Sequence, residues 1–319
     1  MLHTSQLQSL GPTRIVAFSL VCLAACLWGT VGVVTRWMYG IADTNPASLG
    51  FFRMAFSVPA LWLSAWLFGI RSWSVRRDDV ARMVALGGAM SAYQVFYMAA
   101  VERAGVTIAV LITLCTAPLM VATLSALFLG EQLTRQIGLA MALALGGTAL
   151  LVGLGVDAKA AAPALQGAAL ALGSALSYAL VTLISRSVAP RYHPLQPIAI
   201  GFTIGALLSL IAAVTFGLRL SYPPLGWALL VYLGLVPTAL GYALFLQGMR
   251  RTPATVASVI SLAEPLTSTT LAALLLGERL SPASLLGAGL LSLALALLAL
   301  DEAAFRRLIQ QWWKRPRGA

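Results

Sequence analysis

A hydrophobic phrase occurs twice in this chain, at residues 116–134 and again at residues 263–281. Three landmarks recur at a constant offset of 147 residues: Pro118 and Pro265, Gly130 and Gly277, and Glu131 and Glu278. Such a duplication predicts two related halves. If each half crosses a membrane an odd number of times, the halves must insert with opposite orientations. This arrangement is typical of alternating-access transporters, in which the substrate site lies between the halves.

The composition is that of a membrane protein. Hydrophobic residues make up 60% of the chain and charged residues 10%, whereas soluble domains carry roughly 25% charged residues. A transmembrane helix needs about 20 mostly apolar residues. The segments that qualify are residues 15–37, 47–69, 80–101, 105–129, 133–153, 166–188, 195–217, 224–248, 254–276 and 281–300. We therefore predict an all-α membrane protein with ten transmembrane helices, arranged as two inverted five-helix repeats.

The basic residues predict the orientation. If the N-terminus is cytoplasmic, 15 of the 21 Lys and Arg residues lie on the cytoplasmic side, five lie outside, and Arg53 lies within a span. This bias places both termini in the cytoplasm. The net charge of +11 is then explained by loops that face anionic lipid, and no nucleic-acid partner is expected.

The predicted segments are a cytoplasmic N-terminus at 1–14, a first repeat at 15–153, a periplasmic linker at 154–165, a second repeat at 166–300 and a basic amphipathic tail at 301–319. The tail places Trp312 and Trp313 on an apolar helical face, which is typical of a helix on the cytoplasmic membrane surface. A membrane anchor is the first interpretation, and a regulatory or partner-binding segment is the alternative.

Two charged residues lie inside predicted spans and away from their ends, at similar depths: Arg53 and Glu264. An ionisable group in hydrocarbon costs at least about 2.5–3.5 kcal/mol, so each should face a cavity or a partner. Either residue could bind cargo, and Glu264 is the candidate for proton coupling or for binding a cationic group. The alternatives are structural: Arg53 as an anchor bonded to carbonyls, and Glu264 as a static support for a helix interruption at Pro265. Ala117 occupies the equivalent position in the first repeat.

Polar aromatic residues lie too deep in their spans to be interface anchors. We predict that they line the substrate cavity together with two hydrogen-bonding residues: Trp28, Tyr93, Tyr97, Tyr178 and Tyr242, with Thr116 and Gln247. Pro118 and Pro265 each remove a helical hydrogen bond near mid-membrane. They predict either a helix break that frees carbonyls for a ligand or only a bend.

Small residues at four-residue spacing predict close helix packing. Two such stripes occur: Gly201 with Gly205, and Gly138 with Ala142 and Gly146. The sequence lacks a His-Glu-x-x-His pair, a Gly-x-Ser-x-Gly elbow and a phosphate-binding loop. We therefore predict no enzymatic activity, no metal and no cofactor.

Three further features accompany the ten spans and the repeat: Trp28 followed by Gly29, Arg53 early in the second span, and a proline followed by Leu-Gly-Glu in the fourth and ninth spans. Over about residues 14–300, these features together resemble the EamA branch of the drug/metabolite transporter superfamily. The resemblance implies a multi-pass secondary transporter of the bacterial inner membrane. We expect export of small metabolites, with amino acids or their derivatives first, and protons as the candidate coupling ion. A drug or sugar-derivative carrier is the alternative within the family. A lipid-modifying enzyme or a receptor is the alternative outside it.

Overall fold

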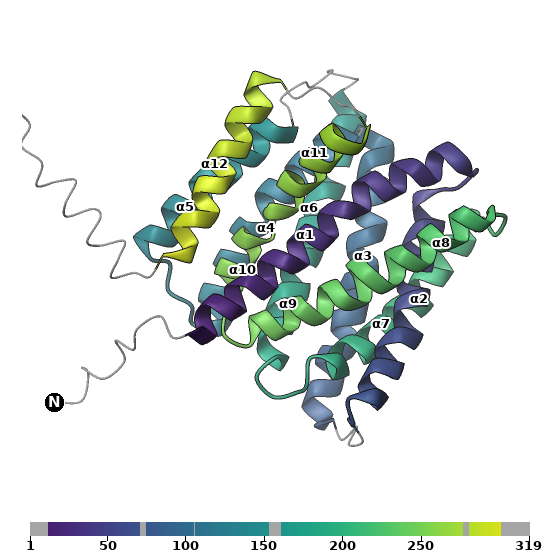
Figure 1. Cartoon of the computed structure of the whole chain (residues 1–319), viewed down its shortest axis with the longest axis horizontal. Helices are drawn as coiled ribbons and strands as arrows, with labels where there is room; N and C mark the ends of the chain where they lie inside the picture. The colour runs from purple at the N-terminus through teal and green to yellow at the C-terminus, as the bar shows by residue number, and fades with distance from the viewer. Residues whose placement is uncertain (1–11, 71–74, 105, 153–160, 277–280, 301–319) are drawn as a thin grey trace, which may run out of the picture.

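The computed structural model describes residues 12–70, 75–104, 106–152, 161–276 and 281–300, and every regular element in these ranges is helical (Figure 1). The α-helices are α1 (Pro12–Ile41), α2 (Pro46–Leu67), α3 (Arg77–Ala104), α4 (Val106–Leu129), α5 (Arg135–Val152), α6 (Ala161–Val188), α7 (Leu195–Thr215), α8 (Pro224–Leu233), α9 (Gly241–Met249), α10 (Ala254–Ile260), α11 (Ala263–Leu276) and α12 (Pro282–Ala299). A π-helix, η1 (Gly234–Leu240), joins α8 to α9.

Helix starts follow the capping signals in the sequence. Ser281 caps α12 by accepting a hydrogen bond from Ser284 N at 3.1 Å, and Pro282 occupies the first turn. The side chain of Asn45 caps α2 in the same way, 2.8 Å from Ser48 N. α4 ends at Leu129, and Gly130 follows with φ 67°. Glycine accommodates this left-handed backbone without a steric penalty.

Eight of the described helical segments are long and apolar enough to cross a membrane. α2 and α5, the second and fifth predicted spans, are not among them, so the count of ten spans stays a prediction. Large apolar side chains point outward from the bundle, for example Trp66, Leu127 and Phe128 at 71%, 72% and 74% exposure. Such a surface is suited to lipid. The tail at 301–319 and the Gly277-Glu278 pair lie outside the described residues.

Two of the predicted spans are interrupted rather than regular. Residues 224–248 form α8, η1 and α9, with Pro237 inside the π-helix. Residues 254–276 form α10 and α11, which are separated at Ser261 and Leu262, just before Pro265. In contrast, α4 runs unbroken through Pro118. Of the two alternatives at Pro118, the helix break is therefore absent from α4, whereas a break does occur just before Pro265.

The two halves pack against each other through pairs of helices that correspond between the halves. α3 and α4 of the first half pack along α6, and α9 and α11 of the second half pack along α1. α2 packs on α7, and α5 packs on α12 (Figure 1). Each of these pairings is reproduced when the spans of one half are exchanged for those of the other.

Close packing at the Gly201 and Gly205 stripe is confirmed. A methyl group built on Gly205 would lie 3.3 Å from Gly87 O and 3.0 Å from Met54 Sδ. The same prediction is wrong for Gly138 and Gly146, because a methyl group on either would meet nothing within 4 Å. The neighbouring Gly147 makes the contact instead, since a methyl group there would lie 2.7 Å from Gly287 O of α12. The helix is turned by one residue, about 100°, from the expected face.

Candidate functional site

A cavity of about 70 Å³ lies inside the bundle. Its walls come from α1, α2, α3, α6, α7, η1, α9 and α11: Trp28, Val31, Arg53, Met54, Met90, Tyr93, Gln94, Tyr178, Phe202, Thr238, Tyr242 and Glu264. A smaller cavity of about 20 Å³ shares Tyr93, Tyr178 and Glu264 with it and reaches α4 and α10. A space of this size holds a few water molecules. Binding of a metabolite would therefore require the helices to move apart.

The π-helix positions the partner of Arg53. Arg53 Nε donates to Thr238 Oγ1 at 3.4 Å, and Thr238 Oγ1 in turn donates to the carbonyl of Leu233 at 2.6 Å. That second bond spans five residues, which is the spacing of the π-turn. It turns the Thr238 hydroxyl toward α2. The guanidinium of Arg53 makes no ion pair within the described residues, and Arg53 is one of the residues that line the cavity.

Glu264 occupies the first turn of α11, directly after the interruption. Pro265 lacks an N–H and cannot follow a regular helical turn, and Glu264 N instead bonds the carbonyl of Ser261 at 3.0 Å. The positive end of the α11 dipole favours a carboxylate here. The Glu264 carboxylate accepts no hydrogen bond and forms no ion pair with any described residue. It is therefore available to a ligand in the cavity it lines.

Two aromatic pairs line the cavity. The rings of Trp28 and Tyr242 lie 4.8 Å apart, and those of Tyr93 and Tyr178 lie 6.1 Å apart. Trp28 Nε1 and Tyr178 OH are buried and have no hydrogen-bond partner in the described part of the chain. Because buried polar groups normally have partners, these two atoms indicate a place for water or cargo.

Three predicted site residues lie elsewhere. The Tyr97 ring stacks on that of Tyr93, with centroids 6.3 Å apart, but Tyr97 is not among the residues that line the cavity. Thr116 Oγ1 donates to its own helix at Ile112 O, 2.6 Å away. Gln247 lines a different cavity. Pro118 borders the smaller cavity from unbroken α4.

The sequence analysis missed several lining residues, of which Thr238 and Met90 are examples. Thr238 follows Pro237, and a proline in a predicted span was the available signal. Nothing in the sequence pattern marks Met90, which resembles any apolar residue of a span. Its place at the cavity depends on how α3 is rotated in the bundle.

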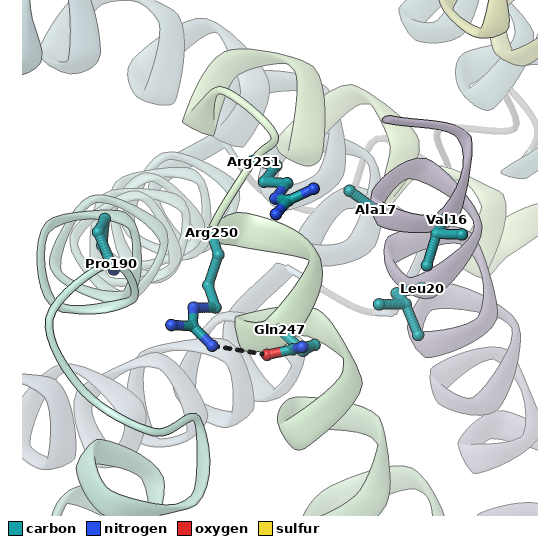
Figure 2. A pocket seen from close by; sticks show the side chains of 7 residues that line it. All are labelled: Val16, Ala17, Leu20, Pro190, Gln247, Arg250 and Arg251. Carbon is teal, nitrogen blue, oxygen red and sulfur yellow. Dashed lines mark hydrogen bonds between the residues drawn. The ribbon is translucent and has the colours of Figure 1, made fainter. Parts of the chain in front are cut away.

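A larger cavity of about 600 Å³ lies at the ends of the helices (Figure 2), and neither Arg53 nor Glu264 lines it. Val16, Ala17 and Leu20 of α1 form one side. Gln247 of α9 and the two arginines that follow this helix, Arg250 and Arg251, form the other, and Pro190 completes the lining.

A bundle of apolar helices around a small cavity lined by a cation, an anion and aromatic rings defines a polytopic membrane protein with an internal polar site. Comparison with known proteins identifies the family. The model of the EamA-like transporter family matches residues 15–153 and 165–300, and this chain belongs to that family. It is a multi-pass membrane transporter.

Its relatives agree with this assignment. The chain is 31% identical to the uncharacterized transporter YwfM of Bacillus subtilis over 88% of this chain and 92% of that protein. It is 28% identical to a probable terminal-alkyne amino-acid exporter of Streptantibioticus cattleyicolor, over 84% of this chain and 91% of that one. A crystal structure superposes with a TM-score of 0.76 at 21% identity, covering 91% of this chain and 98% of its own. That similarity shows the fold.

Proposed function

We propose that this protein is a secondary active transporter that exports small amphipathic metabolites, with amino acids or their derivatives as first choice. The observation that carries the proposal is the pair of charges in one cavity. Arg53 and Glu264 both line it, yet they do not form an ion pair with each other. A zwitterion matches this arrangement, since its carboxylate would meet Arg53 and its ammonium group Glu264.

The aromatic walls favour cargo with an apolar part. Trp28, Tyr178 and Tyr242 supply flat surfaces, and the free indole N–H and phenol O–H supply orienting polar groups. The amino-acid exporter among the relatives supports the same cargo class.

The aromatic pairs also support an inverted repeat with alternating access. Trp28 corresponds to Tyr178 at an offset of 150 residues, and Tyr93 corresponds to Tyr242 at 149. Exchanging the halves therefore converts the Trp28–Tyr242 pair into the Tyr178–Tyr93 pair. Two equivalent walls around a central site allow one half to rock against the other. With the basic residues of the loops inside, both termini face the cytoplasm.

Proton coupling through Glu264 is part of the proposal. A carboxylate that gains and loses a proton during the cycle would link proton movement to cargo. In proteoliposomes, wild-type protein should accumulate a labelled amino acid when a pH gradient is applied, and the rate should saturate with cargo. Glu264→Gln keeps the shape of the side chain but removes the charge change. It should lose pH-driven flux while exchange of cargo at equal pH persists.

Glu102→Gln is the matched control, because Glu102 is an exposed carboxylate near the end of α3. It should transport like the wild type. Normal pH-driven flux in Glu264→Gln at equal protein levels would leave this residue with a structural role. Saturable flux of sugars or drugs in a cargo panel, with none for amino acids, would favour the alternative carrier.

A further inference from the structure

The cavity of about 600 Å³ has an amphipathic lining that the transport site does not use. Val16 and Leu20 project from the first turns of α1 on one side (Figure 2). Val16 is 55% exposed, as is its neighbour Ile15. Gln247, Arg250 and Arg251 form the other side, where the Arg251 guanidinium points toward Ala17 and the Arg250 guanidinium toward Gln247 (Figure 2). An apolar wall beside guanidinium groups at the end of membrane helices matches an amphipathic anion.

The two arginines are not occupied by the protein itself. Arg250 Nη1 makes one long hydrogen bond, 3.5 Å to Gln247 Oε1, and Arg251 has no ion pair among the described residues. The carbonyl groups at the end of α9 accept hydrogen bonds from another arginine. Arg186 Nη1 already donates to Met249 O at 2.7 Å and to Arg250 O at 3.2 Å.

Glu131, which holds the start of α10 in the segment after these arginines, already has partners of its own. Glu131 accepts hydrogen bonds from Ala254 N at 2.6 Å and from Thr255 N at 3.0 Å, and it lies 3.9 Å from Arg186 Nε. Among the described residues, Glu131 forms an ion pair with Arg186 and none with Arg250 or Arg251. His193, in the turn between α6 and α7, lies within the electrostatic influence of Arg250. Partial burial and the charge of Arg250 lower the pKa of His193.

We propose that this cavity binds an anionic phospholipid. The phosphate would accept hydrogen bonds from Arg250 and Arg251, and one acyl chain would lie along Val16 and Leu20 of α1. Guanidinium groups bind phosphate oxygens through paired, charge-assisted hydrogen bonds. Basic residues at helix ends meet the headgroups of anionic lipid. A soluble anion would leave the apolar wall of α1 without a partner, and this is the reason to assign a lipid.

Native mass spectrometry of the full-length protein tests the assignment. The protein is released from detergent micelles containing equal amounts of phosphatidylglycerol and phosphatidylcholine. The wild type should retain one phosphatidylglycerol in preference to phosphatidylcholine. The Arg250→Gln/Arg251→Gln variant should lose this preference, with affinity lower by about thirty-fold. Arg250→Lys/Arg251→Lys keeps both charges and should retain most of the selectivity.

The matched control is Arg77→Gln/Arg135→Gln. It removes two exposed arginines, at the first residues of α3 and α5, that do not line this cavity. The control should bind phosphatidylglycerol like the wild type. Equal loss in control and test variants would mean that the general charge of this face attracts the lipid, and it would overturn the site. Displacement of the lipid by inorganic phosphate, or by a transported amino acid at its transport concentration, would overturn the choice of ligand. Unchanged melting temperatures verify that every variant is folded.

Discussion

Replacement of Glu131 by alanine should lower the free energy of unfolding by about 3 kcal/mol. Glu131 follows the left-handed Gly130 and reaches across the bundle to the start of α10. α10 begins after Pro253, whose side chain makes no capping hydrogen bond. The Glu131 carboxylate takes over this role by accepting from Ala254 N, Thr255 N and Thr255 Oγ1, at 2.6, 3.0 and 3.0 Å.

The magnitude follows from the contacts that are lost. A helix cap contributes about 1 kcal/mol, and a carboxylate at a helix N-terminus adds about 0.3–1 kcal/mol. Ala254 and Thr255 are 0% and 1% exposed, so water cannot easily replace the acceptor. An unsatisfied buried donor costs about 1–3 kcal/mol. Allowing for partial relaxation, the sum is about 3 kcal/mol. Glu131→Gln retains one acceptor oxygen and should cost about half as much.

Equilibrium unfolding of the purified protein in detergent, followed by circular dichroism, measures these differences. Gln132→Ala is the control, because Gln132 is the exposed next residue of the same loop. Its effect should stay within about 0.5 kcal/mol. The reasoning is refuted if Glu131→Ala is no more destabilising than this control, or if Glu131→Gln costs as much as Glu131→Ala.

Two further substitutions test the packing and the charges of the bundle. Gly147→Ala should lower the melting temperature, because the added methyl group would lie 2.7 Å from the backbone of α12. Gly146→Ala should leave the melting temperature unchanged, because a methyl group there would meet nothing within 4 Å. Equal melting temperatures for the two would show that α5 and α12 are not packed in this way. Asp79→Asn should cost about 2 kcal/mol in the same unfolding assay, because Asp79 is fully buried and accepts from Tyr192 OH at 2.7 Å and from Arg191 Nη1 at 2.9 Å. Asp78→Asn, at an exposed neighbour, is its control, and an equal effect of both would contradict the buried cluster.

The site was predictable to the extent that single residues were unusual for their surroundings. Arg53 and Glu264 stand out because a charge in a hydrocarbon span needs a reason. Trp28 and Tyr178 stand out because a deep polar ring needs a partner or a cavity. All four line the same cavity. The predictions for Thr116 and Gln247 were wrong, since neither lines this cavity. A threonine in a helix can bond its own backbone, and a glutamine near a helix end can face a different opening.

The helices could be predicted from local sequence, one segment at a time. Within a membrane each helix satisfies its own backbone hydrogen bonds, so apolar length and capping residues are enough to place most helical segments. Which side chains meet is decided between segments far apart in the chain. Arg53 bonds Thr238 across 185 residues, and Glu131 caps a helix that begins 123 residues later. The rotation of α5, which turns Gly147 rather than Gly146 toward α12, belongs to the same class. A shift of one residue about the helix axis changes which glycine faces α12, and only the simultaneous packing of all the helices sets that rotation.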